Sequence, residues 1–311
     1  GLVIFDSIIQ YFLGFNLLGY EMVNYHLQGQ ISYLTGFFGD EKKLGSYLVR
    51  FLPLAVSLIY FHKPKIQFKL EFIIIFLIGL VVYHSSERTA LFLLFVIYFS
   101  YFLISNKKIY FGAIGLILFT LLFNSDHHLK TKYISFTLKQ IGLNTYLSKT
   151  SDKRESDNKI IRYYSKEHED LSFTGIEIFK QNLLFGSGIK SFYHECNHLK
   201  KQKIIKPTKR ENFMTCSTHP HNTYVQVLSE IGIFGFLLVI FLFVKIGLKM
   251  FVIIFKKEKS NLDKSIFFIN LGIIVNLMPL IPSGSFFNNW ICLMMFFSLG
   301  FWLYVQDRLK S

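Results

Sequence analysis

The sequence predicts an all-α, multi-pass membrane protein. It has 311 residues, of which 51% are hydrophobic and 18% aromatic, more than a soluble domain of this length needs. Apolar runs long enough to cross a hydrocarbon core of about 30 Å recur along the chain. Only helices cross such a core as separate segments without leaving backbone groups unpaired. We therefore expect a bundle of transmembrane helices.

Seven spans are predicted, four in the first part of the chain and three near its end. Their ranges are 44 to 61, 70 to 84, 89 to 104, 109 to 123, 222 to 248, 265 to 281 and 286 to 304. The chain begins with Gly1 and shows no signal peptide at its front, so we expect a truncated start with further helices upstream.

The short loops predict the orientation of these spans. Segments 62–69, 106–108 and 256–264 and the tail 306–311 are basic, whereas the turn 282–289 carries no Lys or Arg. Because Lys and Arg accumulate on the cytoplasmic side, the basic segments are expected inside. Three parts follow: a membrane domain at 1–123 with an outer N-terminal segment, a large outer loop at 124–221, and a membrane domain at 222–311.

The outer loop is too long for a simple connector. Its stretch "LSFTGIEIFKQNLLFG" (171–186) predicts short amphipathic helices on the outer membrane surface. Cys196 and Cys216 lie in its later part. In an oxidising compartment they would form a disulfide that closes the basic segment between them, and the alternative is two free thiols.

The formal net charge of +14 raises the question of a nucleic-acid partner. The Lys and Arg residues are scattered between apolar spans and match no nucleic-acid-binding motif, so we expect no nucleic acid. Membrane lipids or an anionic, lipid-linked substrate fit this charge better.

Two arginines are candidates for binding an anion at the outer face. Arg88 begins a span in "HSSERTALFLL", where its guanidinium can hold a phosphate, and the alternative is a snorkelling arginine at the interface. Arg50 lies about two turns inside the preceding span, where a cation faces a polar cavity or a partner. The alternative for Arg50 is an internal ion pair with Glu87 or Glu230.

Two histidines precede the long apolar run that starts near residue 222. Pro220 suits the first turn of a helix, which Thr218 or His219 would cap. The helix N-terminus would then favour an anion beside His219 and His221 and lower the pKa of a nearby imidazole. A neutral histidine at such a place fits a general base, and structural hydrogen bonding is the alternative. No third and fourth ligand has the spacing of a metal site, so no metal is expected. His168 is predicted to be a solvated loop residue.

These residues resemble the bacterial O-antigen ligase and O-antigen polymerase superfamily. Its signature is His, then Asn, Ser or Gln, nine residues, and Gly-x-x-Gly, and here His221, Asn222, Gly232 and Gly235 match it. "SSERTALFLL" resembles the family's Ser-x-Arg-Thr-Ala element and assigns its functional arginine to Arg88. The order of features also agrees, from "QYF.G….LGY" (10–20) through "GSYLVR" (45–50) to "IFKQNLLFGSGIKSF" (178–192).

The resemblance also has implications for the remaining site residues. Relatives carry cysteines at the places of Cys196 and Cys216, which favours the disulfide. Relatives often have Arg after the Phe of the last element, but Tyr193 follows Phe192 here, so a loop arginine is expected to complete the site. Arg162 is the candidate, ahead of Arg154 and Arg210.

The function that the resemblance implies is glycosyl transfer at the periplasmic face of the bacterial inner membrane by a GT-C-like helix bundle. The donor would be a glycan on undecaprenyl diphosphate, and the acceptor a sugar hydroxyl of lipid A-core or of a second lipid-linked glycan. His221 would be the base and Arg88 a catalytic cation. Arg50, Arg162, His219 and Asn222 would bind substrate, with inversion and without metal or cofactor. A lipid-linked glycan transporter or flippase, or a structural envelope protein, is the alternative outside this enzyme class.

Overall fold

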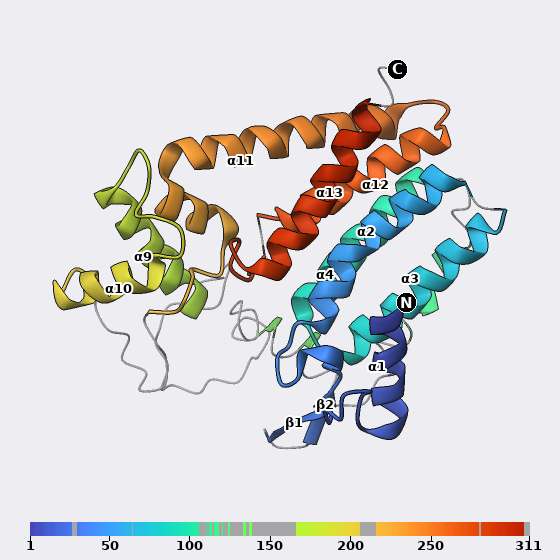
Figure 1. Ribbon diagram of the computed structural model, residues 1–311, viewed down its shortest axis with the longest axis horizontal. Helices are drawn as coiled ribbons and strands as arrows, with labels where there is room; N and C mark the ends of the chain where they lie inside the picture. Colours follow the sequence, from blue (N-terminus) through green and yellow to red (C-terminus); the bar gives the residue numbers. More distant parts are fainter. Residues whose placement is uncertain are drawn as a thin grey trace, which may run out of the picture. The chain divides into compact units, whose positions relative to one another are not determined.

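The computed structural model describes residues 1–26, 30–63, 65–105, 110, 112–113, 115–117, 120, 124, 133–134, 137–138, 166–205, 216–279 and 281–307. In these residues the chain is predominantly helical (Figure 1). It divides into two compact units. Unit 1 comprises Gly1–Tyr133, Ile246–Asn276 and Met294–Ser311, and unit 2 comprises Ile134–Lys245 and Leu277–Leu293.

Unit 1 is built around a buried helix, α2 (Leu44–His62), which packs against α3 (Gln67–His84), α4 (Arg88–Ile104) and α12 (Asn261–Asn276). Ser57 on α2 and Ser265 on α12 exchange hydrogen bonds: each hydroxyl donates to the other residue's carbonyl oxygen, at 2.7 and 3.0 Å. Small residues at such a contact let two helices approach closely and satisfy polar groups away from water.

A buried carboxylate lies inside the same bundle. Glu71 on α3 is 3% exposed and accepts hydrogen bonds from the hydroxyl of Tyr60 (3.2 Å), the amide of Gln67 (2.8 Å) and the hydroxyl of Tyr101. An ionisable side chain at this depth requires such partners. The polar groups of this cluster therefore satisfy one another.

The N-terminal segment forms α1 (Leu2–Leu13), the hairpin of β1 (Val23–His26) and β2 (Gln30–Tyr33), and the 3-10 helix η1 (Gly36–Phe38). The polar face of α1 is its buried face. Asp6 accepts from the N–H of Leu17 (2.9 Å), and Gln10 accepts from the N–H of Gly36 (2.8 Å). The hairpin pairs Val23 with Tyr33 in antiparallel register and adds a short two-stranded element to the expected all-α fold. Its β-branched and aromatic residues suit strands.

Among the described residues, four helices are long and apolar enough to cross a membrane: α2, α3, α11 (Thr223–Phe255) and α13 (Asn289–Asp307). They correspond to the predicted spans 44–61, 70–84, 222–248 and 286–304. α4 has 17 residues and α12 has 16, so these two predicted spans are shorter helices. Most of the predicted span 109–123 lies outside the described residues, and a total of seven spans stays a prediction.

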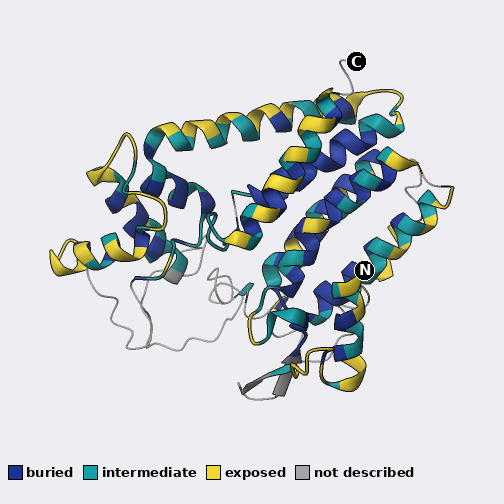
Figure 2. Cartoon of the chain, in the orientation of Figure 1, coloured by how far each residue is buried: buried dark blue, intermediate teal, exposed yellow. Residues whose placement is uncertain are grey.

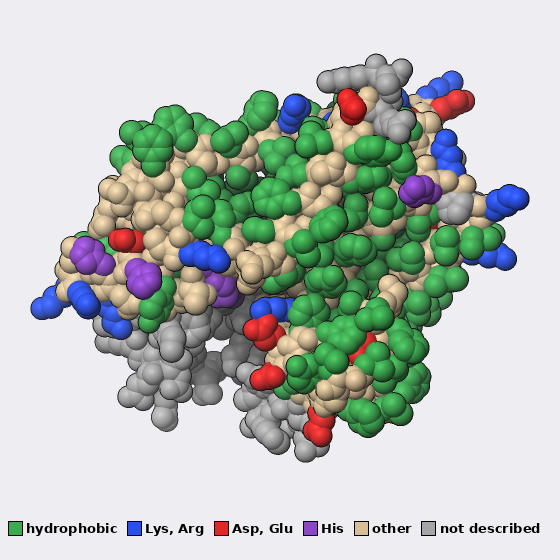
Figure 3. Space-filling view, viewed as in Figure 1, with side chains coloured by type: hydrophobic (Ala, Val, Ile, Leu, Met, Phe, Trp, Pro, Cys, Tyr) green, Lys and Arg blue, Asp and Glu red, His purple; other side chains and the backbone are tan. Residues whose placement is uncertain are grey.

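Large apolar side chains cover much of the surface that these helices present (Figure 3). On α11, exposed residues recur along the helix (Figure 2), and Leu238 and Phe241 are 69% and 64% exposed. A helix that is apolar all round and poorly covered by protein is suited to a lipid environment. Together with the spans, this surface indicates a multi-pass membrane protein.

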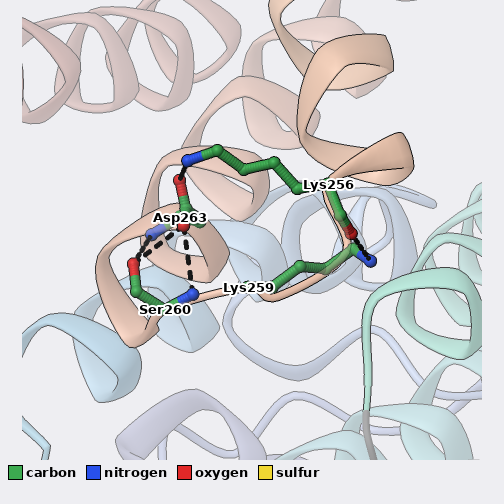
Figure 4. A network of polar contacts seen from close by, with 4 residues as sticks. All are labelled: Lys256, Lys259, Ser260 and Asp263. Atoms are coloured by element: carbon green, nitrogen blue, oxygen red, sulfur yellow. Dashed lines mark hydrogen bonds and ion pairs between the residues drawn. The ribbon is translucent and has the colours of Figure 1, made fainter.

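The turn between α11 and α12 is closed by a polar network (Figure 4). Asp263 accepts from the N–H and the hydroxyl of Ser260 (3.0 and 2.9 Å), and the N–H of Asp263 donates to that hydroxyl (3.1 Å). Lys256 pairs with Asp263 at 2.7 Å. This reciprocal arrangement is a capping box, which fixes the start of α12 at Asn261.

Unit 2 contains α9 (Lys166–Gln181), α10 (Phe192–Lys201), the first part of α11, and the segment Leu277–Leu293. α9 and α10 pack through a small apolar core formed by Leu171, Ile178, Phe192 and Leu199. The amphipathic helix predicted within 171–186 is therefore confirmed, but it begins earlier, at Lys166.

Helix α11 is broken inside unit 2 at Gly232, which has φ 77° and ψ −167°. Two features require glycine at this position. The backbone lies in a region that favours glycine, and an added Cβ would collide with backbone atoms of Leu184 and Gly186. The loop 183–188 fills the break and pairs with its backbone. The N–H of Ile233 donates to the carbonyl oxygen of Leu183 (2.9 Å). In the other direction, the N–H groups of Ser187 and Gly188 donate to the carbonyl oxygens of Ser229 and Glu230 (both 3.0 Å).

Candidate functional site: a histidine loop in unit 2 and an arginine cluster in unit 1

Helix α11 begins at Thr223, and Asn222 is its N-cap. The side-chain oxygen of Asn222 accepts from the N–H of Tyr224 (3.0 Å) and of Val225 (3.1 Å), and its amide donates to the carbonyl of Pro279 (3.3 Å). The expectation that Thr218 or His219 caps this helix, with Pro220 in its first turn, is wrong. Asn222 also occupies two of the N–H groups that were expected to bind an anion.

The reason for this later start is the backbone of His221. Its φ is 54°, a left-handed conformation from which a regular helix cannot continue. The carbonyl oxygen of His221 accepts from the N–H of Ser283 (2.8 Å), in the segment that precedes α13. A non-glycine residue keeps such a conformation only where its surroundings impose it, and this is common at functional sites.

Three imidazole rings lie together in unit 2. The ring centroids of His219 and His221 are 4.1 Å apart, and the ring of His168, on α9, is 5.4 Å from that of His221. The prediction that His168 is a solvated loop residue is wrong. It was missed because 53 residues separate it from His221 and no motif links the two.

The position of His168 follows from how α9 packs on the start of α11. Gly175, two turns after His168, approaches α11 so closely that an added Cβ would collide with the side chain of Val225. The same Cβ would lie 3.8 Å from Pro220. A glycine on this face of α9 therefore permits the packing that brings His168 close to residues 219–221, which we call the histidine loop.

Burial sets the protonation of these histidines. It lowers the pKa of His219 to about 4, with further lowering from the positive charges of His221 and His168. Burial also lowers the pKa of His221 below its ordinary value of 6.5. Both rings are therefore neutral at pH 7, and a neutral imidazole can accept a proton.

Cys196 on α10 and Cys216 form a disulfide, with their Cα atoms 5.5 Å apart. Both cysteines are buried, at 0% and 6% exposure. Cys216 lies five residues before His221. The disulfide therefore ties the segment that carries the histidines to α10.

In unit 1, Glu87 joins the turn before α4 to the first turn of α2. Its carboxylate accepts from the N–H of Gly45 (2.6 Å) and from the N–H (3.1 Å) and hydroxyl (2.6 Å) of Ser46. An added Cβ on Gly45 would collide with the hydroxyl of Ser85, so this close approach requires glycine. The negative charge of Glu87 suits the positive end of α2.

Arg50 and Arg88 lie in this same region of unit 1. Arg50 lies six residues after the start of α2, is 4% exposed, and its guanidinium donates to the carbonyl of Ser46 (3.2 Å). Burial raises the pKa of Glu87, and the positive charge of Arg50 opposes that rise. Of the two partners considered for Arg50, the charge of Glu87 acts on it. Arg88 is the first residue of α4 and half-buried.

The structure thus brings His168, His219, His221 and Asn222 together in unit 2, and Arg50, Glu87 and Arg88 together in unit 1. Arg162, Arg154 and Arg210 lie outside the described residues. Within the described part of the chain, no three His, Cys, Asp or Glu side chains are gathered as metal ligands.

Comparison with known proteins adds one finding. A family model described as O-antigen ligase matches residues 73–240, a range that includes Arg88, both cysteines and His221. A search of curated proteins and a search of solved structures each found no match to the chain.

Proposed function

The chain belongs to the O-antigen ligase family, and from that premise we propose that it is an inner-membrane glycosyltransferase. It moves a glycan from undecaprenyl diphosphate to a sugar hydroxyl at the periplasmic face, as a ligase or a polymerase of surface polysaccharide. The acceptor is lipid A-core in the first case and a second lipid-linked glycan in the other.

The observation that carries this proposal is the state of His221. It stands in the loop directly before a membrane-length helix, in a left-handed backbone conformation held by Ser283. Burial lowers its pKa, so it is neutral at pH 7. A positioned neutral imidazole is the group most often used to take a proton from a hydroxyl.

The proposed reaction needs a base and a cation site. His221 takes the proton from the acceptor hydroxyl while its oxygen forms a bond to the anomeric carbon. The bond between that carbon and the diphosphate oxygen breaks, and undecaprenyl diphosphate leaves. Attack opposite the leaving group inverts the anomeric centre.

Arginine side chains are assigned to the diphosphate. Arg88 and Arg50 carry fixed positive charge, and a guanidinium forms charge-assisted, often bidentate, hydrogen bonds to phosphate oxygens. Such charges stabilise the negative charge that grows on the leaving group. Arg162 is assigned to complete this site from the outer loop.

Asn222 and His219 are assigned supporting roles beside His221. Asn222 fixes the start of α11 and so the direction of His221, because both polar ends of its side chain are engaged. The ring of His219 lies close to that of His221 in a tilted arrangement, and its low pKa keeps it from adding positive charge beside the base.

Complementation tests the proposal. In a strain that lacks its own copy of the protein, the chain with His221→Ala or Arg88→Ala should restore no surface glycan, whereas His194→Ala on the exposed face of α10 should restore it. Normal glycan from both site variants, at normal protein levels, would overturn the proposal. Glycan size in the deleted strain separates the two types: a polymerase loss leaves a single repeat on the core, and a ligase loss leaves the core bare.

A further inference from the structure

Glu230 is a buried carboxylate on α11 that accepts hydrogen bonds from N–H groups at the start of α10. It is 1% exposed and sits on α11 two residues before the break at Gly232. One carboxylate oxygen accepts from the N–H of Lys190 at 2.9 Å, and the other accepts from the N–H of Phe192 at 3.4 Å. Glu230 therefore holds the N-terminus of α10, where a negative charge suits the helix dipole.

A second bond holds the carboxylate in place from its own helix. The side-chain amide of Gln226, one turn earlier on α11, donates to Glu230 at 3.2 Å and to the hydroxyl of Ser285 at 2.9 Å. The side-chain Oε1 of Gln226 accepts from the N–H of Phe286 at 2.8 Å. The orientation of Glu230 is thus fixed by the same segment that supports His221 through Ser283.

α10 is in turn joined to the histidine loop. Cys196 lies one turn after Phe192, and its disulfide partner Cys216 lies five residues before His221. These links form a closed ring. Glu230 is hydrogen-bonded to the start of α10, and α10 carries Cys196, which is joined by the disulfide to Cys216. The chain then continues from Cys216 through His221 into α11 and returns to Glu230. We call this the Glu230 ring.

The Glu230 ring includes His221, one of the non-glycine residues with a left-handed backbone. His221 has φ 54°, which a histidine adopts only where the surrounding structure imposes it. The disulfide holds the chain before His221, and the Asn222 cap holds the chain after it. If the bonds of Glu230 are lost, the disulfide no longer ties the loop to a fixed α10.

We propose that Glu230 is a positioning residue for His221 and acts through α10 and the Cys196–Cys216 disulfide. This inference rests on the proposed function, in which His221 is the base. It assigns to Glu230 no contact with substrate. The hydrogen bonds of Glu230 and the disulfide are two links in the same ring. Breaking either link therefore removes the same restraint on the histidine loop.

Initial rates of glycan transfer test this inference, measured in detergent with lipid-linked glycan and acceptor extracted from cells that lack the protein. Glu230→Ala should lower kcat by about 100-fold, as expected when a catalytic group is misplaced by about 1 Å, and leave KM nearly unchanged. Glu230→Gln keeps one acceptor oxygen for these N–H groups and should recover part of the rate. Glu177→Ala, which removes an exposed pair with Lys180 on α9, is the matched control.

The decisive comparison is a double-mutant cycle. Cys196→Ser with Cys216→Ser should lower kcat, and adding Glu230→Ala should lower it little further, because both changes open the same ring. Losses that simply multiply, or an unchanged kcat per folded Glu230→Ala protein, would overturn the inference. His221→Ala distinguishes this result from failure of the proposed function: if that variant is inactive while Glu230→Ala is fully active, only the positioning role is wrong.

Discussion

The N–H of Ile233 donates to the carbonyl oxygen of Leu183 across the break in α11, at 2.9 Å. A helix broken within a membrane-length segment exposes backbone groups that need partners. Here the loop before α10 provides them. The Gly-x-x-Gly end of the family signature and the segment 186–188 therefore belong to one structural unit.

The contact between the loop 183–188 and the break in α11 predicts a strict requirement for glycine at position 232. Gly232→Ala places a Cβ against backbone atoms of Leu184 and Gly186 and forces an unfavourable φ. We expect a loss of at least about 1 kcal/mol in the free energy of unfolding, measured by thermal unfolding in detergent. Gly247→Ala, on the same helix with nothing within 4 Å of the added Cβ, is the control and should be neutral or stabilising. Equal stability of the two variants would contradict the account.

The disulfide predicts the number of reactive thiols. The chain has three cysteines, of which Cys292 is free. Denatured, non-reduced protein should therefore bind one maleimide per chain, and reduced protein should bind three. The label should map to Cys292 alone before reduction, and labelling of Cys196 or Cys216 at that stage would refute the pairing.

The exposed apolar face of α11 predicts that a charged side chain there makes membrane insertion less favourable. Leu238→Arg puts a cation on a side chain that is 69% exposed in the middle of a span. Insertion of the isolated α11 segment should become less favourable by about 2.5–3.5 kcal/mol, measured as the fraction that integrates in a glycosylation-reporter assay. Leu238→Phe should insert as the unchanged segment does. Equal insertion of the Arg variant would contradict the assignment of Leu238 to the middle of a membrane span.

The histidine loop predicts how transfer depends on pH. Since burial holds the pKa of His221 below 6.5, most of the rings are neutral between pH 8 and 6.5, and protonation of the base should lower the rate by less than half over this range. The acid limb of the pH profile should have its midpoint below 6.5. A midpoint above 6.5 that disappears in His221→Ala would contradict the assigned environment.

The same lowered pKa values predict acid sensitivity of folding. An unfolded histidine protonates near 6.5, whereas His219 in the folded chain protonates only near pH 4. In this window the unfolded state binds more protons, so the free energy of unfolding should fall as the pH is lowered from 6.5 toward 4. His219→Asn should flatten that dependence in thermal unfolding scans, and an unchanged slope would rule out this contribution.

Much of the helical architecture could be predicted from the sequence, because long apolar runs leave few alternatives to a spanning helix. The spans 44–61, 70–84, 222–248 and 286–304 correspond to helices, and His221 was expected at the mouth of a span, where the structure places it. The capping of α2 by Glu87 was not predicted. It depends on contacts between residues 41 or 42 positions apart, which no local pattern encodes.

The start of α11 shows the same limit. Thr218 and Pro220 form a reasonable helix start by local preference, yet the left-handed backbone of His221 moves the start to Thr223. That conformation depends on Ser283, which is 62 residues away in the sequence. The position of His168 and the bonds of Glu230 to α10 are likewise set by tertiary packing.

The proposed function depends on His221 acting as the base in glycan transfer. The most direct measurement is the initial rate of transfer by folded His221→Ala protein, compared at equal protein concentration with the unsubstituted chain and with His194→Ala. The account predicts that His221→Ala is slower by about 100- to 10,000-fold, the range for loss of a general base, and that His194→Ala transfers at the normal rate. A His221→Ala protein that transfers glycan at the rate of the unsubstituted chain would contradict it.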